Sequence, residues 1–193
     1  MNYVVFALLL GACGANGVAL RSNATLQDIR DFLNTTKTIY VYSTSQSSFF
    51  DDYGDVGEIE ASCMQYRPTS LGNDKYIFNM SYMLNSTWRT ENISVQLNLT
   101  ALQTPYMIEN WGEDKSRELR LDVYDRDAGS ALFYYLGYFN KRSHRLCETH
   151  VHGEQVVSYE NNTSNICTSH AEKICQGGTR KAYTNGCGTS SLK

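Results

Sequence analysis

Proline is scarce in this 193-residue chain, which has only two prolines against fourteen tyrosines. Proline cannot donate a hydrogen bond to a β-ladder, whereas aromatic side chains fit pleated surfaces, so the composition favours a strand-rich domain. The chain also lacks a large excess of either charge, because its formal net charge is −3. Neither lysine nor arginine forms a run. We therefore expect no nucleic-acid partner and no polybasic contact with a membrane.

The N-terminus has no hydrophobic run long enough to span a membrane. Residues 4–10 form a short apolar stretch followed by small residues, and the first twenty residues carry no charged side chain. A bilayer span needs about 20 apolar residues, so this stretch is too short for an anchor. It is typical of a cleaved secretory signal. We expect residues 1–19 to be that signal and residues 20–193 to form one secreted, extracellular domain.

Motifs of several enzyme classes are missing. The sequence contains no Gly-x-Ser-x-Gly elbow, no His-Glu-x-x-His helix, no phosphate loop and no Cys-x-x-Cys pair. The best metal alternative is His150 with His152, which share one face of a predicted strand and need a third ligand such as His144 or His170. So generic a pattern is a weak signal, and we expect no catalytic residues, no cofactor and no metal.

Asn-x-Ser/Thr acceptors are abundant. Eight of them in one chain point to the secretory route of a eukaryote and predict a glycoprotein. Two of the eight are adjacent in sequence and cannot both be modified. The predicted glycosylation sites are Asn23, Asn34, Asn79, Asn85, Asn92, Asn98, Asn161 and Asn162.

The hydrophobic period predicts two helices around a series of strands. Residues 25–33 show helical spacing behind a Thr25 cap, and residues 167–176 form a second helix before two glycines. Between them the period is 2, which predicts eight strands at residues 38–45, 58–66, 75–88, 92–99, 118–125, 130–139, 144–151 and 154–160. We expect an all-β fold, an eight-stranded antiparallel up-and-down barrel, with a two-sheet sandwich as the alternative.

On the predicted strands at residues 75–88 and 92–99, the acceptor asparagines fix which face points inward, because a glycan must stand outside and side chains alternate. The same alternation on residues 118–125 places Leu119 and Val123 inside, since charged residues occupy the positions between them. These positions belong to a larger set, part of which we expect to line a ligand site. An ordinarily filled core is the alternative, because small barrels are often filled by side chains. The predicted ligand-lining residues are Tyr76, Phe78, Met80, Tyr82, Val95, Leu97, Leu121 and, less directly, Glu148.

Cysteine usage carries the family resemblance. Loss of Cys13 with the signal leaves Cys63, Cys147, Cys167, Cys175 and Cys187, an odd number. With the segment TLQDIRDFLNTTKTIYVYSTS, these positions resemble the salivary lipocalins of ticks, the group that includes histamine-binding proteins. The resemblance implies the bridges Cys63–Cys187 and Cys147–Cys167, with Cys175 as the free thiol. We expect a monomer, with a Cys175-linked dimer as the alternative.

The same resemblance implies a non-catalytic binder that sequesters host mediators of inflammation and so evades host defence. Its amine-binding members have a Cys-Asp pair and a later Glu-Leu-aromatic triplet, whereas this chain has Cys147-Glu148 and Val157-Ser158-Tyr159. Because the assigned interior is apolar, we prefer a leukotriene or fatty-acid ligand oriented by Tyr76 and Tyr82 over histamine or serotonin. The directions of Glu58, Glu60 and Glu109 stay open, and the alternative function is a protein-binding lipocalin with a filled barrel.

Overall fold

The computed structural model describes residues 24–45, 61–72, 75–112, 115–139, 142–162 and 165–189. The predicted signal peptide and Asn23 lie outside these residues, as do Glu58 and Glu60. No helix in the described part of the chain is long and apolar enough to cross a membrane.

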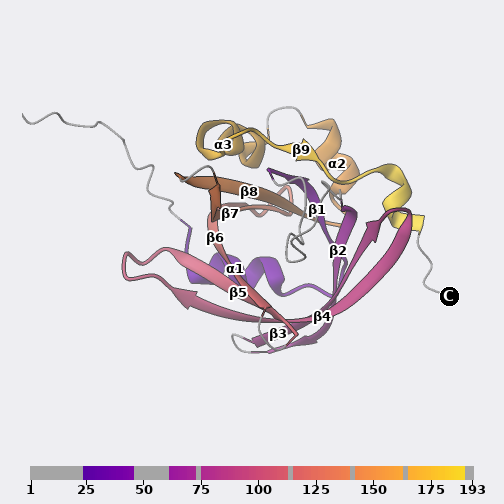
Figure 1. Cartoon of the computed structure of the whole chain (residues 1–193), viewed down its shortest axis with the longest axis horizontal. Helices are drawn as coiled ribbons and strands as arrows, with labels where there is room; N and C mark the ends of the chain where they lie inside the picture. Colours follow the sequence, from indigo (N-terminus) through magenta and orange to yellow (C-terminus); the bar gives the residue numbers. More distant parts are fainter. Residues whose placement is uncertain are drawn as a thin grey trace, which may run out of the picture.

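The first helix, α1 (Leu26–Leu33), begins where the sequence predicts. Thr25 caps it, because its hydroxyl accepts a hydrogen bond from the Asp28 amide while the Asp28 carboxylate accepts one from the Thr25 amide. Helical spacing then places Ile29, Phe32 and Leu33 on one face, where all three are buried in the main core. The ribbon of α1 lies within the ring of strands in Figure 1.

Eight antiparallel strands form the closed barrel. Each strand pairs with its neighbour in sequence, and β1 pairs with both β8 and β2, which closes the ring. The predicted up-and-down barrel with flanking N-terminal and C-terminal helices is confirmed. The strands are β1 (Ile39–Thr44), β2 (Ser62–Leu71), β3 (Lys75–Leu84), β4 (Thr87–Leu99), β5 (Pro105–Trp111), β6 (Lys115–Asp125), β7 (Ser130–Phe139) and β8 (Arg142–His152).

Side-chain alternation follows the predicted faces on β3 and β4. Ile93 and Val95 are buried, whereas Asn92 and Asn98 on the same strand are exposed. Asn79 lies directly opposite Asn92 on the outer face and is half-buried. Four further predicted glycan acceptors are exposed, namely Asn34, Asn85, Asn161 and Asn162.

The predicted number of eight barrel strands is right, but one predicted strand is wrong and one real strand is absent from the prediction. Residues 154–160 were predicted as a strand but lie largely in a helix, α2 (Val156–Asn161), which buries Val156 and Tyr159 at a spacing of three residues. The segment leaves the barrel after the turn at residues 153–155, so helical spacing decides its conformation. Conversely, β5 was not predicted, because the strand begins at a proline and includes a glutamate and an asparagine.

Val123 is a further correction. A bulge between Leu121 and Val123 shifts the register of β6 against β7, and a single extra residue reverses the faces of all residues after it. Leu119 and Leu121 remain in the barrel core, but Val123 packs outside it against the cluster under α3, and Tyr124 contacts the barrel core instead.

An outer layer covers β8 and β1. It consists of α2, α3 (Ile166–Ile174), the two-residue strand β9 (Arg180–Lys181) and the 3-10 helix η1 (Asn185–Thr189). Figure 1 shows α3, β9 and α2 beside β8 and β1, outside the ring of strands. The Cys63–Cys187 disulfide joins β2 to η1 in this layer, as the resemblance implies.

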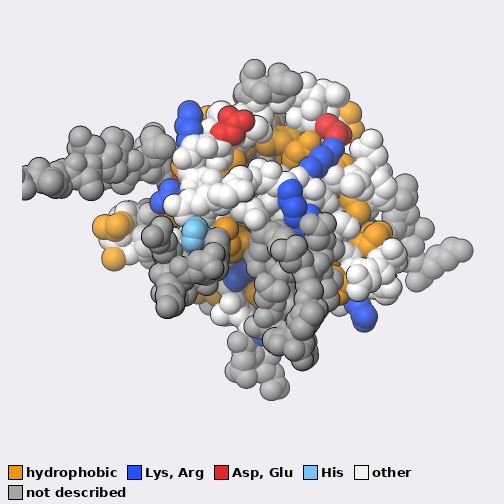
Figure 2. Space-filling view, turned by 45° about the horizontal axis from the view of Figure 1, so that its top comes forward, with side chains coloured by type: hydrophobic (Ala, Val, Ile, Leu, Met, Phe, Trp, Pro, Cys, Tyr) orange, Lys and Arg blue, Asp and Glu red, His pale blue; other side chains and the backbone are white. Residues whose placement is uncertain are grey.

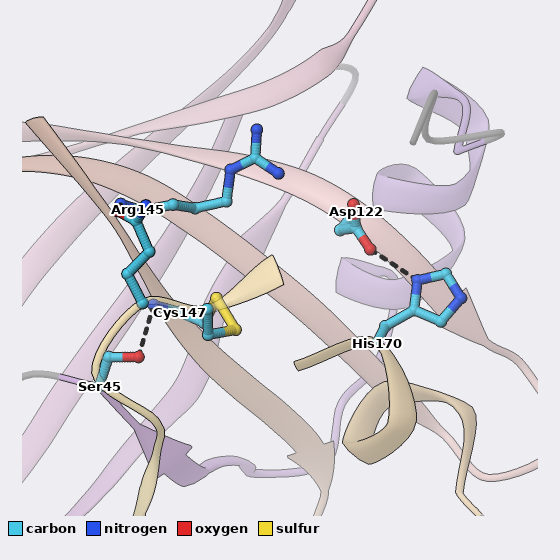
Figure 3. The surroundings of a disulfide bond; sticks show 7 residues. Ser45, Asp122, Arg145, Cys147 and His170 are labelled. Atoms are coloured by element: carbon cyan, nitrogen blue, oxygen red, sulfur yellow. Dashed lines mark hydrogen bonds and ion pairs between the residues drawn. A yellow bond between two sulfur atoms is a disulfide. The ribbon is translucent and has the colours of Figure 1, made fainter. Parts of the chain in front are cut away.

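The second disulfide differs from the expectation. Cys147 pairs with Cys175, not with Cys167, and Cys167 is the buried free thiol. The reason is the placement of the C-terminal end of α3, where Gln176 exchanges two hydrogen bonds of 2.9 Å with the backbone of Arg145. Cys175 is therefore bonded to Cys147, whose disulfide is drawn in Figure 3, and Cys175 is not the free thiol on which the predicted alternative of a linked dimer depended.

Candidate functional site

A charged cluster lies inside the barrel, and the β5–β6 hairpin contributes half of it. Glu109 on β5 and Arg117 on β6 are paired opposite each other in the ladder. Glu109 shares its face with the buried Met107, and Arg117 shares its face with the buried Leu119. Strand alternation therefore directs one acid and one base into the same interior.

Arg117 is the centre of the cluster. Its Nε donates to Glu109 Oε2 at 2.6 Å, and its Nη1 and Nη2 donate to the two carboxylate oxygens of Glu148 at 2.8 and 3.3 Å. Nη2 also donates to the Tyr66 hydroxyl at 2.8 Å. The planar guanidinium suits this arrangement, because it presents several donors in a fixed fork.

β8 adds a histidine to the same cluster. Glu148 and His150 are two residues apart on β8, so both face the interior, and His150 Nε2 lies 3.0 Å from Glu148 Oε2. The His150 ring stacks on Tyr66 with a centroid distance of 5.5 Å and contacts Phe133 at 5.0 Å. The ring is thus held between aromatic side chains, with one nitrogen on the carboxylate.

Burial makes these charges interact strongly. The side chains of Glu109 and Glu148 are 2% and 0% exposed, and that of Arg117 is 14% exposed. Burial alone raises the pKa of Glu148, but Arg117 and the His150 hydrogen bond outweigh it and hold this pKa below its ordinary value. Burial lowers the pKa of Arg117, yet Glu109 and Glu148 together raise it well above the ordinary value.

The cluster forms one wall of a small interior cavity. Glu109, His150 and Tyr66 line it on the polar side, opposite apolar residues from α1 and the strands. Its volume is about 10 Å³, which is about the space of one water molecule. In this structure the barrel is filled by its own side chains, and the cation among the two carboxylates is Arg117.

No family model matches the sequence, and no curated protein sequence matches it significantly. Solved structures do match its fold. H1 crustacyanin from the lobster Homarus americanus has a TM-score of 0.56 at 9% identity, with 84% of this chain and 87% of that chain covered. Apocrustacyanin C1 has a TM-score of 0.53 at 10% identity, covering 82% of this chain and 80% of that one. For lobster apocrustacyanin A1 the TM-score is 0.51 at 10% identity, with coverages of 83% and 87%.

These neighbours are lipocalins. The chain has the lipocalin fold. In the lipocalin barrel of this chain, most of the predicted lining residues are buried, and Leu97 is half-buried. Phe78 and Val95 line the interior cavity. The buried predicted residues are Tyr76, Phe78, Met80, Tyr82, Val95, Leu121 and Glu148.

The two tyrosines expected to orient a ligand lie away from the charged cluster. The Tyr82 hydroxyl donates to Glu91 at 3.0 Å, and Tyr76 lines a recess beside α1. Tyr66 is the tyrosine that contacts the charges. The sequence left the direction of Glu109 open, and its patterns were not used to predict Tyr66 or Arg117 as site residues. A signal for Arg117 was present, because it shares the parity of Leu119 and Leu121.

The histidines considered for a metal site take part in other contacts. His152 bonds to the Phe32 carbonyl at 2.9 Å and stacks on the Phe32 ring, while His170 lies outside the barrel and bonds to Asp122 at 2.8 Å. Within the described ranges, no three His, Cys, Asp or Glu side chains are grouped so that they can hold a metal ion.

Proposed function

We propose that this chain is a secreted, non-catalytic lipocalin that binds a small cationic ligand in its barrel. The ligand class is a biogenic amine such as histamine or serotonin. By its cysteine and helix–strand pattern the protein resembles tick salivary lipocalins, in which such binding sequesters host mediators of inflammation and evades host defence. Two disulfides support an extracellular location.

The observation that carries this proposal is the charge of the interior. Two buried acidic side chains, Glu109 and Glu148, contact one guanidinium, so the acids in the cluster outnumber the single arginine by one. Isolated buried charge is costly, and clusters of this kind are enriched at functional sites. A ligand with one positive charge balances the excess.

The preference for a lipid ligand, which the sequence alone favours, loses its main support. It rested on an interior without acids, but Glu109 and Glu148 both face the barrel interior. A carboxylate-bearing lipid would add a further negative charge beside them. Among the mediators considered, an amine therefore suits the described lining better than a leukotriene or a fatty acid.

Binding requires Arg117 to move. Its guanidinium occupies the place between the carboxylates where an ammonium group would bind, and the free cavity is only about 10 Å³. Of the three charged side chains, Arg117 is the most exposed, so it can turn toward solvent while the carboxylates stay. An incoming amine and Arg117 then compete for the same two acids.

Calorimetry tests the proposal. Histamine and serotonin should release binding heat, while leukotrienes and fatty acids should not. Glu148→Gln should abolish the amine signal, because it removes one of the two carboxylates. Glu154→Gln is the matched control, since Glu154 is exposed on the surface. Heat from lipids alone, or amine binding that survives Glu148→Gln, would contradict the assignment.

Arg117→Met tests the competition directly. The variant should lose about 3–5 kcal/mol of stability, because it leaves two buried carboxylates without their partner. Saturating histamine should then raise its Tm by more than it raises that of the unmodified protein, because the competing guanidinium is gone. Arg120→Met, at an outward position of the same strand, should behave like the unmodified protein. Equal Tm shifts in all three would exclude Arg117 as the competitor.

A second function is favoured by the small cavity itself. If Arg117 never leaves, the barrel stays filled and the protein acts as a protein-binding lipocalin that blocks a host protein through its loops. Native mass spectrometry of the secreted protein with histamine, serotonin and eicosanoids separates the two functions. A small-molecule adduct supports the amine function, and its absence at every concentration supports protein binding.

A further inference from the structure

A second recess lies outside the barrel, between α3 and β9. Its volume is about 530 Å³, within the range of small-molecule sites. Its lining includes Tyr42 and Ser43 from β1, Thr149 from β8, Tyr159 from α2, and Thr168 and Ala171 from α3. Thr149 is the residue between Glu148 and His150, so strand alternation directs it away from the barrel interior. The recess is therefore separate from the charged cluster.

Both walls of the recess are fixed to the barrel. The Cys147–Cys175 disulfide holds the end of α3, and the Cys63–Cys187 disulfide holds the segment after β9. β9 also pairs with β1, and the Ala182 amide donates to the Tyr42 carbonyl at 2.8 Å. A recess with two anchored walls is formed before a ligand arrives, which lowers the entropic cost of binding.

The floor of the recess combines aromatic rings with hydroxyl groups. The rings of Tyr42 and Tyr159 meet edge to face with centroids 4.8 Å apart. The Tyr159 hydroxyl lies 3.2 Å from Thr168 Oγ1. Tyr159 and Thr149 are themselves only 5% and 1% exposed, so Thr168 carries the hydroxyl that a ligand can reach. Ala171 on α3 has a short side chain and leaves space above these groups.

Charge at the recess is balanced. Lys181 lies over the Tyr42 ring at 5.3 Å and forms an ion pair with Glu160, while Arg180 on β9 and Glu172 on α3 add one base and one acid to the lining. Figure 2 brings the side with α2, α3 and β9 forward and shows hydrophobic side chains at the surface between acidic and basic ones. The described lining has no continuous aliphatic surface for a lipid tail, and its charged side chains are of both signs.

We infer that this recess binds a neutral saccharide ring. One face of a pyranose carries C–H groups that pack on the accessible part of an aromatic ring such as Tyr42, and its hydroxyls exchange hydrogen bonds with the accessible hydroxyls of Ser43 and Thr168. Tyrosine suits such a site because it has an apolar body and a polar tip. The saccharide is either an external one or a glycan attached at Asn161 or Asn162, the predicted acceptors at the end of the helix that holds Tyr159.

The test uses the full mature chain produced without glycans and titrated with methyl glycosides of glucose, galactose, mannose and N-acetylglucosamine. NMR should show shift changes at the rings of Tyr42 and Tyr159 with at least one glycoside. Thr168→Leu should abolish them, because it fills the recess and removes a hydroxyl. Thr168 is exposed and leucine favours a helix, so the variant should fold. Lys173→Leu, on the same helix but outside the recess, is the control.

The source of the saccharide is decided by the glycosylated protein. If its own glycan fills the recess, added glycoside should bind only after Asn161→Gln and Asn162→Gln are combined. If the ligand is external, the glycosylated and unglycosylated proteins should bind equally. Absence of any shift at Tyr42 and Tyr159 in the unglycosylated chain, or shifts that survive Thr168→Leu, would overturn the inference. Glu148→Gln should leave saccharide binding unchanged, which separates this site from the barrel.

Discussion

At Glu148, burial and charge act in opposite directions. The side chain is completely buried, which disfavours its ionised form, but Arg117 and His150 contact it and favour that form. The effect of these partners is larger than that of burial, so the pKa of Glu148 lies below the ordinary value of 4.5. A carboxylate whose pKa is lower in the folded than in the unfolded state stabilises the fold when ionised.

The sign of this shift predicts an acid-sensitive barrel. The contribution of Glu148 is fully present above pH 4.5, its ordinary value, and is lost as the pH falls through the lower folded value. Urea unfolding of the unmodified protein should therefore show a falling midpoint at acidic pH. Glu148→Gln should have a lower urea midpoint at neutral pH, and its midpoint should fall less steeply as the pH becomes acidic.

Glu154→Gln is the control for this pH series. Glu154 is exposed and lies 3.8 Å from Lys37 on the surface, where a single ion pair contributes little. At acidic pH its urea midpoint should fall as steeply as that of the unmodified protein. An equally steep fall in all three proteins would mean that Glu148 does not hold its charge in the folded state.

At the scale of the element, α3 is attached to the barrel at three places. Its C-terminal end is joined through Cys175 to Cys147, its middle through the His170–Asp122 hydrogen bond of 2.8 Å, and its end again through Gln176. Figure 3 shows the disulfide of Cys147 and the hydrogen bond between His170 and Asp122. The buried face of the helix is small, comprising Cys167, Ala171 and Ile174, so these polar and covalent links matter.

The variant Cys175→Ser tests the covalent link. The Cys147–Cys175 bridge closes a sequence separation of 28 residues, and a bridge of this loop size contributes about 2–4 kcal/mol. Denaturant unfolding should show a loss of that size, because the unfolded chain regains the freedom of the loop. Peptide mapping of the parent protein should find Cys147 linked to Cys175.

Cys167→Ala is the comparison for this prediction. Cys167 is completely buried, and burial raises its pKa to about 12, so the thiol stays protonated at neutral pH. Its removal should leave both disulfides intact. Mapping that finds Cys147 linked to Cys167 in the parent protein would refute the pairing and restore the one implied by the family resemblance.

At the scale of the whole molecule, the barrel has one weak seam. β3 and β4 pair over ten residues from Lys75 to Leu84, whereas within the described residues β1 and β2 pair at two positions, Ile39 with Tyr66 and Tyr40 with Gln65. A ladder with few hydrogen bonds opens at a lower free energy than a long one. The barrel should therefore open first between β1 and β2.

Native-state hydrogen exchange tests the seam. The amides of Tyr40 and Gln65 should exchange faster than those of β3 residues such as Phe78 and Met80, which lie in the middle of the long ladder. A saturating amine should slow exchange at the seam only if binding stabilises the closed barrel. Equal protection at β1 and β3 would show that the barrel opens as one unit.

The sequence by itself determined the faces of most strands and the first helix. Ile93 and Val95 are inside because Asn92 and Asn98 alternate with them, and α1 begins after Thr25 because that hydroxyl and Asp28 form a local capping box. These features depend on residues within a few positions of one another, so a local pattern is sufficient to predict them.

Tertiary structure alone decided the disulfide partner of Cys147 and the assembly of the charged cluster. Cys167 lies on α3 and Cys175 directly follows that helix, and the packing of the helix end against Arg145 selects Cys175. Glu109, Arg117 and Glu148 meet only because the barrel closes three strands around one interior. Their contacts span up to 31 positions in sequence, and no local periodicity encodes which distant side chains share a buried space.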